Sequence, residues 1–199
     1  VVGDMPFGSY QSGVRDAISN GTRFLKEAGC DAIKLEGGLD VCDTVNALVR
    51  AGISVIGHIG LTPQTATQLG GYKVQGRDIA SAKKMIEEAR ALEKAGVFAL
   101  VLECIPDELG RIVSEEIAIP TIGIGAGVYC DGQVLVTHDL LGMFDTFIPS
   151  FVKSYCTLAP AIKEAVQEYN SEVRSGSYPD KEHSFRGESN LRELLGLDE

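Results

Sequence analysis

The sequence predicts an α/β fold built around a parallel β-sheet. Short apolar runs alternate with amphipathic segments, and the runs are apolar throughout rather than at every second residue. Parallel strands show this continuous pattern because the helices of their crossover connections bury them on both faces. Glycine follows alanine at three segment ends, Ala28-Gly29, Ala51-Gly52 and Ala95-Gly96, and glycine suits the left-handed position after a helix.

The expected strands are short and occur in series with the expected helices. Strands are expected at residues 1–3, 32–35, 54–57, 98–102, 121–124 and 134–137. Helices are expected where apolar residues recur at intervals of three and four. These segments lie at residues 14–28, 82–95 and 161–173, and a short helix is expected within 190–197.

Six strand–helix units fit either of two architectures, an open doubly wound sheet or six-eighths of a (β/α)₈ barrel. No Gly-x-Gly-x-x-Gly follows the first strand, which weighs against a dinucleotide-binding sheet. The chain opens on Val1 inside an apolar strand, so we expect that an N-terminal part is absent. The composition turns polar near Ser175, which predicts an α/β domain over 1–174 and a polar C-terminal tail over 175–199.

Charge and composition exclude several classes of partner. The chain has 28 Asp and Glu against 18 Lys and Arg, a net charge of −10. Binding to nucleic acid or to an anionic membrane needs clustered basic residues, whereas here they are scattered among acids. No run approaches the roughly 20 apolar residues that span a bilayer. Five cysteines without a Cys-x-x-Cys pair indicate free thiols and a cytoplasmic protein.

Ionisable side chains end most of the expected strands. Asp4 ends the first strand, Lys34 and Glu36 the second, His58 the third and Glu103 the fourth, while His138-Asp139 follows the last. In parallel α/β folds the active site lies at the carboxyl ends of the strands. A desolvated charge costs several kcal/mol unless it is paired or bound to a metal. The set therefore predicts a functional site.

The alternation of side chains along a strand predicts which of these groups meet. Lys34 and Glu36 are two residues apart and share a face, while Leu35 points to the other face. The same parity places Glu103 on one face with Val101. If Leu35 packs under the helices, the charged groups converge on one mouth of the sheet.

Two carboxylates beside a lysine predict a hard cation and an anionic substrate. Mg²⁺ takes one or two carboxylates, keeps water and accepts substrate oxygens. Asp4 and Glu36 are the expected ligands. Lys34 would offset a substrate carboxylate, and Glu103 would move protons. A structural ion-pair cluster is the alternative interpretation.

Two loops are weaker candidates. Residues 123–127 form a Gly-rich turn that could hold a phosphate or could simply be a tight corner after a strand. Residues 58–73 form a long connection, and long connections in compact domains are usually lids or binding segments.

Several long, irregular segments resemble ketopantoate hydroxymethyltransferase, in order from residue 1 to about residue 185. They are Asp4-Met5-Pro6-Phe7, Lys34-Leu35-Glu36-Gly37-Gly38, the segment 57–64, the segment 70–77, Leu102-Glu103-Cys104-Ile105-Pro106 and the segment 122–127. The resemblance implies a (β/α)₈ TIM-type barrel of the phosphoenolpyruvate/pyruvate superfamily. It also implies a cytosolic homo-oligomer, typically a decamer.

The resemblance further implies an activity in pantothenate biosynthesis. The family transfers a hydroxymethyl group from 5,10-methylenetetrahydrofolate to 3-methyl-2-oxobutanoate with Mg²⁺, giving 2-dehydropantoate. Asp4 and Glu36 are implied as metal ligands, and Asp4 and Lys34 in binding the keto acid. Glu103 is implied as the proton acceptor. His58 is a further candidate for substrate contact.

One departure from the family pattern is large. The first two βα units of the family, with a Gly-Asp-Ser segment whose Asp binds metal and whose Ser binds substrate, have no counterpart in this sequence. We expect a fragment of an active enzyme rather than a degenerate, non-catalytic relative. Another Mg²⁺-dependent lyase or mutase of the same superfamily is the remaining alternative.

Overall fold

The computed structural model describes residues 1–144 and 147–197, which belong to two compact units. The first comprises Val1–Val136 with Pro149–Val152, and the second Thr137–Ile148 with Lys153–Glu199. The second unit contains the helices α5 (Thr137–Leu140), α6 (Ala159–Ser175) and α7 (Leu191–Leu194). The domain boundary expected between residues 174 and 175 lies within this unit and stays a prediction.

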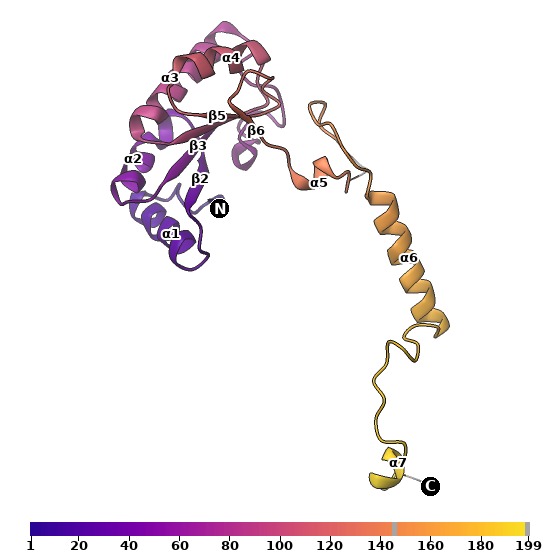
Figure 1. The fold of residues 1–199 in the computed structure, drawn as a ribbon. Coiled ribbons are helices and arrows are strands. Elements are labelled where there is room, and N and C mark those ends of the chain that lie inside the picture. Colours follow the sequence, from indigo (N-terminus) through magenta and orange to yellow (C-terminus); the bar gives the residue numbers. More distant parts are fainter. Residues whose placement is uncertain (145–146, 198–199) are drawn as a thin grey trace. The chain divides into compact units, whose positions relative to one another are not determined.

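The first unit is built on a six-stranded parallel sheet (Figure 1). The strands are β1 (Val2–Asp4), β2 (Ala32–Glu36), β3 (Val55–Gly60), β4 (Ala99–Glu103), β5 (Thr121–Ile124) and β6 (Gly132–Gln133). Their order in the sheet is their order in the sequence. Each neighbouring pair is parallel, which confirms the predicted parallel α/β fold.

The last strand differs from the prediction. A strand was expected at residues 134–137, but β6 has two residues, Gly132 and Gln133. The Asp131 carboxylate accepts hydrogen bonds from the Thr121 amide at 2.8 Å and from its hydroxyl at 3.0 Å. These hydrogen bonds hold Asp131 beside Thr121, so that pairing with β5 begins at Gly132. Val134 and Val136 follow it and are 45% and 50% exposed, so their apolar character does not mark a buried strand.

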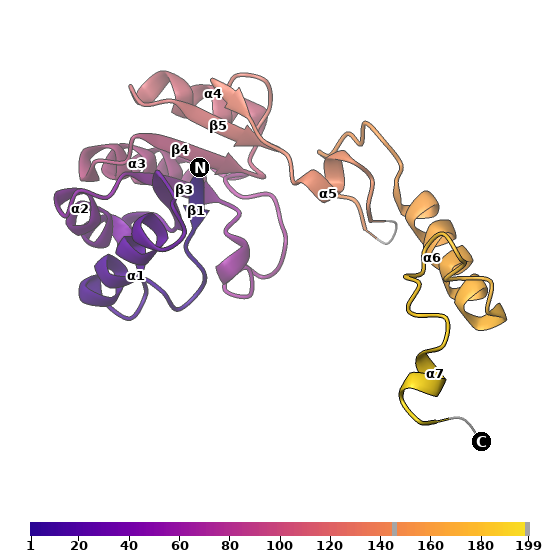
Figure 2. The same ribbon diagram turned by 60° about the horizontal axis from the view of Figure 1, so that its bottom comes forward.

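The helices of the first unit are α1 (Val14–Lys26), α2 (Cys42–Arg50), α3 (Ile79–Ala95) and α4 (Asp107–Glu116), with short 3₁₀ turns η1 (Leu39–Val41) and η2 (Pro63–Thr65). Each helix packs against the next one in sequence. Figures 1 and 2 show the four helices along one side of the sheet. Right-handed crossovers between strands taken in sequence order place every helix on the same face. A doubly wound sheet has helices on both faces, so the structure is a curled half-barrel instead.

Capping residues define α3, the helix beside the site. The Asp78 carboxylate accepts hydrogen bonds from the backbone N–H groups of Ala80 and Ser81, both at 3.0 Å. The helix ends at Ala95, and Gly96 follows with φ +106°, which glycine adopts without strain. The Ala-Gly ending therefore marks a helix end here, as predicted.

The two faces of the sheet carry different cores, as strand parity predicted. Ile33, Leu35, Leu100 and Leu102 are buried on the helix side. Ile56, Ala99, Val101 and Ile124 form a smaller cluster on the opposite face, where Phe151 packs against them. Each fully buried aliphatic side chain contributes about 1.5–3 kcal/mol, so the register of the sheet is strongly specified.

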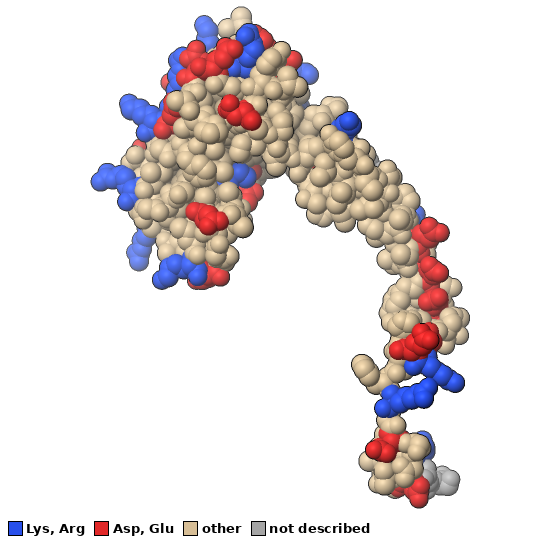
Figure 3. Space-filling view, viewed as in Figure 1, with Lys and Arg blue, Asp and Glu red and all other residues tan. Residues whose placement is uncertain are grey.

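The surface carries no concentrated basic patch on the face shown in Figure 3, where Lys and Arg are interspersed with Asp and Glu. Within the described part of the chain, no helix has the length and apolar character needed to cross a membrane.

Candidate active site

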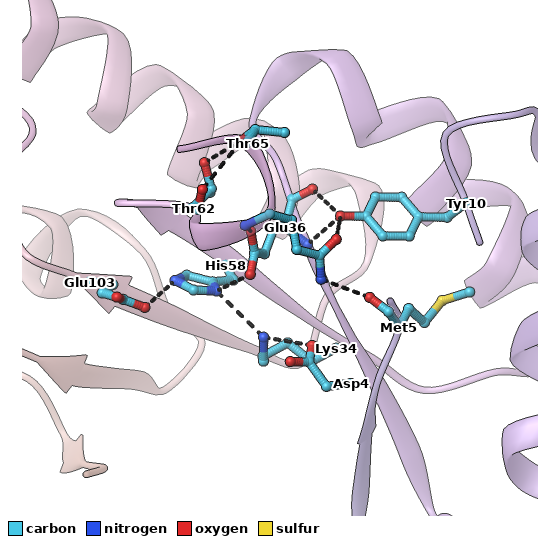
Figure 4. Close-up of polar contacts among 10 residues, drawn as sticks. Asp4, Met5, Tyr10, Lys34, Glu36, His58, Thr62, Thr65 and Glu103 are labelled. Carbon is cyan, nitrogen blue, oxygen red and sulfur yellow. Dashed lines mark hydrogen bonds and ion pairs between the residues drawn. The ribbon is translucent and has the colours of Figure 1, made fainter. Parts of the chain in front are cut away.

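Strand register brings the five predicted residues to one edge of the sheet. Asp4 is paired with Lys34, and Glu36 with His58. Gly60, two residues after His58, is paired with Glu103. All are at or near the carboxyl ends of β1 to β4, where parallel α/β enzymes place their active sites. Figure 4 shows their side chains directed toward one another.

Four of the side chains form a continuous series of polar contacts (Figure 4). The Lys34 Nζ is 2.7 Å from Asp4 Oδ1 and 3.4 Å from His58 Nδ1. On the other side of the imidazole, His58 Nε2 is 3.1 Å from Glu103 Oε2. Groups from four neighbouring strands are therefore linked through one lysine and one histidine.

The neighbours of His58 favour one form of its ring. The His58 side chain is 4% exposed, and an ammonium group faces its Nδ1. In the neutral ring, a protonated Nδ1 would place two donors against each other, so in that form Nδ1 is the acceptor and Nε2 carries the proton. The contact of Nε2 with Glu103 lacks hydrogen-bond geometry, and Nε2 has no other partner among the described residues. This N–H is free to bond a shifted Glu103 or a ligand.

Glu36 is buried and is held from several sides. Its Oε2 accepts a hydrogen bond from the Gln64 backbone N–H at 3.0 Å, and its Oε1 is 3.8 Å from His58 Nδ1. Burial raises the pKa of the Glu36 carboxyl, and the Gln64 hydrogen bond opposes that shift. No Lys or Arg of the described chain lies within ion-pair distance of it. A buried carboxylate so short of positive charge can accept a cation.

Tyr10 and Gln64 support Glu36 and were not assigned a role from the sequence. The Tyr10 hydroxyl donates to the Glu36 carbonyl oxygen at 3.0 Å and accepts from the Glu36 N–H at 3.2 Å. Burial raises the pKa of Tyr10 to about 12. The Gln64 Nε2 donates to the Met5 carbonyl oxygen at 2.8 Å. Gln64 belongs to a segment that carried the family resemblance, whereas nothing in the sequence around Tyr10 indicated its contact.

The donor set fits a cation that keeps much of its own water. In the described part of the chain, no three His, Cys, Asp or Glu side chains are grouped to hold a metal ion. The described residues therefore do not form a tetrahedral zinc site of protein ligands. Mg²⁺ needs one or two carboxylates and takes water and substrate oxygens for the rest. Asp4 and Glu36, on one face of adjacent strands, match that requirement.

A cavity of about 440 Å³ adjoins Glu36. Its walls are formed by Tyr10 and Gln11, by residues 36–41 at the end of β2, by parts of residues 59–76 from the end of β3 onward, and by one face of α3 between Ser81 and Glu88. The long connection predicted to be functional thus forms a wall of this cavity.

The other sequence candidates have less support. Gly125 and Gly127 have φ values of +64° and +82°, and a side chain at either would collide, with Phe151 and Asp107 respectively. Tight packing therefore accounts for these glycines, and phosphate binding stays untested. His138 and Asp139 belong to α5 in the second unit.

A parallel half-barrel with acids, a lysine and a histidine at its strand ends belongs to the α/β enzymes that work at this edge of the sheet. The family description for ketopantoate hydroxymethyltransferase matches residues 1–181. The chain therefore belongs to the ketopantoate hydroxymethyltransferase family, and it is an enzyme that transfers a one-carbon group.

Two named relatives agree with this assignment. The 3-methyl-2-oxobutanoate hydroxymethyltransferase of Desulfotalea psychrophila is 58% identical over 199 residues, covering 100% of this chain and 71% of the relative. The protein of the same name from Syntrophomonas wolfei is 58% identical over 185 residues, 93% of this chain and 67% of the relative. The crystal structure of a putative lyase/mutase from Burkholderia cenocepacia has 16% identity and a TM-score of 0.48, over 98% of this chain and 69% of that one.

Proposed function

We propose that the enzyme transfers a hydroxymethyl group from 5,10-methylenetetrahydrofolate to 3-methyl-2-oxobutanoate, giving 2-dehydropantoate for pantothenate biosynthesis. The observation that carries this proposal is the linked series Asp4–Lys34–His58–Glu103 beside the buried Glu36. At one edge of the sheet, these residues bring together groups that can bind an anionic substrate, bind a cation and accept a proton. Relatives that carry this activity in their names support the choice of substrate.

Asp4 and Glu36 are the proposed Mg²⁺ ligands. When bound there, the ion would polarise the 2-oxo acid and make its neighbouring C–H more acidic. The Lys34 ammonium would offset the substrate carboxylate, together with Asp4, which positions that ammonium through their 2.7 Å contact. His58, whose Nε2 has no hydrogen-bond partner in the part of the chain that the structure describes, is a further candidate for substrate contact.

Glu103 is the proposed proton acceptor. Its carboxylate takes the proton from C3 of the keto acid as that C–H bond breaks. The carbon then bonds to the methylene carbon of the folate, whose two C–N bonds break, and water supplies the hydroxyl group of the product. The two nitrogens released from the methylene carbon take up the proton from C3 and the remaining proton of the water, so tetrahydrofolate leaves. The Glu103 side chain is 15% exposed, so a substrate can reach it while bulk water is largely excluded.

We further propose that the half-barrel is part of a (β/α)₈ barrel of the phosphoenolpyruvate/pyruvate superfamily. Two features support this: the helices cover one face only, and β1 has a neighbour on one side only among the described strands. That two βα units are missing before β1 remains a prediction from the resemblance, as do the cytoplasmic location and the decameric homo-oligomer.

Replacing Glu103 by Gln in the intact enzyme tests the proposed base. The amide keeps the shape of the side chain but cannot take a proton, so kcat should fall about 10²- to 10⁴-fold. The KM for the keto acid should stay within a few-fold. Product formation is measured by mass spectrometry with and without the folate donor. Near-normal turnover would remove Glu103 from the mechanism, and product formed without the donor would point to a different reaction.

A further inference from the structure

The cavity beside Glu36 lies next to the proposed reaction centre. Two of its lining residues, Glu36 and Gly60, are the sheet partners of His58 and Glu103. Gly60 has φ +94°, and a side chain there would collide with the Glu103 backbone. The cavity therefore borders Glu36, one of the proposed metal ligands, at the carboxyl end of β2.

The cavity is larger than a five-carbon keto acid needs. A volume of about 440 Å³ is within the range of sites for drug-sized molecules, roughly 300–1,000 Å³. Leu39, Val41, Ile59 and Met85 supply apolar walls, and Glu88 on α3 supplies a carboxylate. Polar side chains, among them Gln68, Gln75 and Ser81, complete the lining. Apolar walls combined with several polar groups suit a planar heterocycle that carries hydrogen-bonding groups on its edge.

Glu88 is a largely buried carboxylate of this cavity that has few hydrogen-bond donors. Its side chain is 15% exposed, and its one ion-pair contact is Lys84 Nζ at 3.4 Å. Apart from Lys84, no residue in the described ranges donates a hydrogen bond to its carboxylate. Burial raises the pKa of Glu88, as expected for a carboxylate that lacks donors. A side chain at Gly38 would overlap the Glu88 carboxylate, so the glycine leaves room for it.

We infer that this cavity binds the pteridine ring of the folate co-substrate, with the Glu88 carboxylate accepting hydrogen bonds from its amino-pyrimidinone edge. That edge presents two adjacent N–H donors, which a carboxylate can accept with both oxygens. The apolar walls contact the faces of the ring, and the methylene group is directed toward Glu36 and Gly60. This inference rests on the proposed function, because that function supplies the folate.

The test uses Glu88→Gln in the intact enzyme, with Glu87→Gln as the matched control. Glu87 is the adjacent, exposed residue of α3 and does not line the cavity. The substitution removes the charge of an acceptor that bonds two donors. The KM for 5,10-methylenetetrahydrofolate should therefore rise about 10- to 100-fold. The control should leave that KM unchanged. Leu69→Trp, which fills the cavity from the connection, should raise the same KM.

A second measurement separates ligand binding from a structural role. Exchange of the C3 proton of the keto acid with deuterium, followed by NMR without folate, needs only the reaction centre. It should stay within about two-fold of wild type in every variant. An unchanged folate KM in both Glu88→Gln and Leu69→Trp would overturn the inference, and so would a parallel loss of deuterium exchange.

Direct binding of tetrahydrofolate, without keto acid, distinguishes this inference from the proposed function. Binding that Glu88→Gln weakens, in an enzyme that forms no product, would sustain the site and refute the proposed reaction. Product formation with tetrahydrofolate binding unaffected by Glu88→Gln would sustain the reaction and refute the site.

Discussion

At the residue scale, the positive charge of Lys34 offsets part of the negative charge of the site. Its ammonium lies between the Asp4 carboxylate and the acceptor nitrogen of His58. Asp4 is largely exposed, whereas Glu36 is buried. The proposed cation would thus join an exposed ligand to a buried one.

Replacing Asp4 by Ala should weaken Mg²⁺ and keto-acid binding together. The change removes one proposed metal ligand and also releases Lys34 from its 2.7 Å contact. We expect at least a 10-fold loss in affinity for each, since charge-assisted contacts are worth about 1.5–3 kcal/mol. Isothermal titration of Mg²⁺, with and without keto acid, measures both. Asp43→Ala, on the exposed surface of α2, is the control. A metal titration that Asp4→Ala leaves unchanged would contradict the assignment.

Replacing Glu36 by Gln should change how stability depends on pH. Burial raises the folded-state pKa of Glu36, so the folded protein holds this proton more tightly than the unfolded chain does. The contribution to stability is present at acid pH and is lost as the pH rises through the folded-state pKa. The Gln variant lacks this loss and should be the more stable protein at neutral pH without divalent ions. Urea unfolding across this pH range, with chelator present, measures the difference.

Addition of Mg²⁺ provides the control for that experiment. An ion that binds only the folded state stabilises it, and the proposed site needs the Glu36 carboxylate. Mg²⁺ should therefore stabilise wild type more than Glu36→Gln. Equal stabilisation of both proteins, or a pH dependence that the substitution leaves unaltered, would count against Glu36 as a buried metal ligand.

At the element scale, strand parity made much of the site predictable. Side chains alternate with a period of two, so Lys34 and Glu36 had to share a face opposite Leu35. The position of Tyr10 was not predictable, because it reaches Glu36 across 26 residues from a loop of irregular backbone. The predicted position of the last strand was wrong. Two hydrogen bonds from Thr121 to Asp131 determine where β6 begins, and such a contact produces no periodic pattern in the sequence.

The buried Thr121 hydroxyl should be important for the stability of the β5–β6 edge. Its Oγ1 is 2.7 Å from Ser114 Oγ on α4 and donates to the Asp131 carboxylate at 3.0 Å. Thr121→Val keeps the shape but removes the hydroxyl contacts with Ser114 and Asp131, which keep their bonds to the Gly110 carbonyl oxygen and the Thr121 amide. It should therefore destabilise folding by about 1–3 kcal/mol. Thr67→Val, at an exposed position, should have little effect. Denaturant unfolding compares the two, and a loss below about 0.5 kcal/mol at Thr121 would be inconsistent with this role.

At the scale of the whole molecule, the placement of the helices decided between the two architectures that the sequence left open. Apolar strands alone are compatible with either a doubly wound sheet or a barrel. Strand order is a property of long-range pairing, and the observed order β1 to β6 puts α1–α4 on one face. The opposite face, with Ile56, Val101 and Phe151, is then the interior of the curve.

A closed barrel in the intact enzyme makes a specific prediction for β1. Its Met5 N–H donates to the Lys34 carbonyl oxygen of β2 at 2.9 Å. Backbone groups alternate along a strand, so the amides of Val2 and Asp4 point away from β2. A barrel has no open edge, so another strand must bond these two amides. Hydrogen exchange of the intact enzyme should then be slow at Val2 and Asp4, as it is expected to be at Met5. Rapid exchange at Val2 and Asp4 beside a slow Met5 would show an open sheet edge and rule out the barrel.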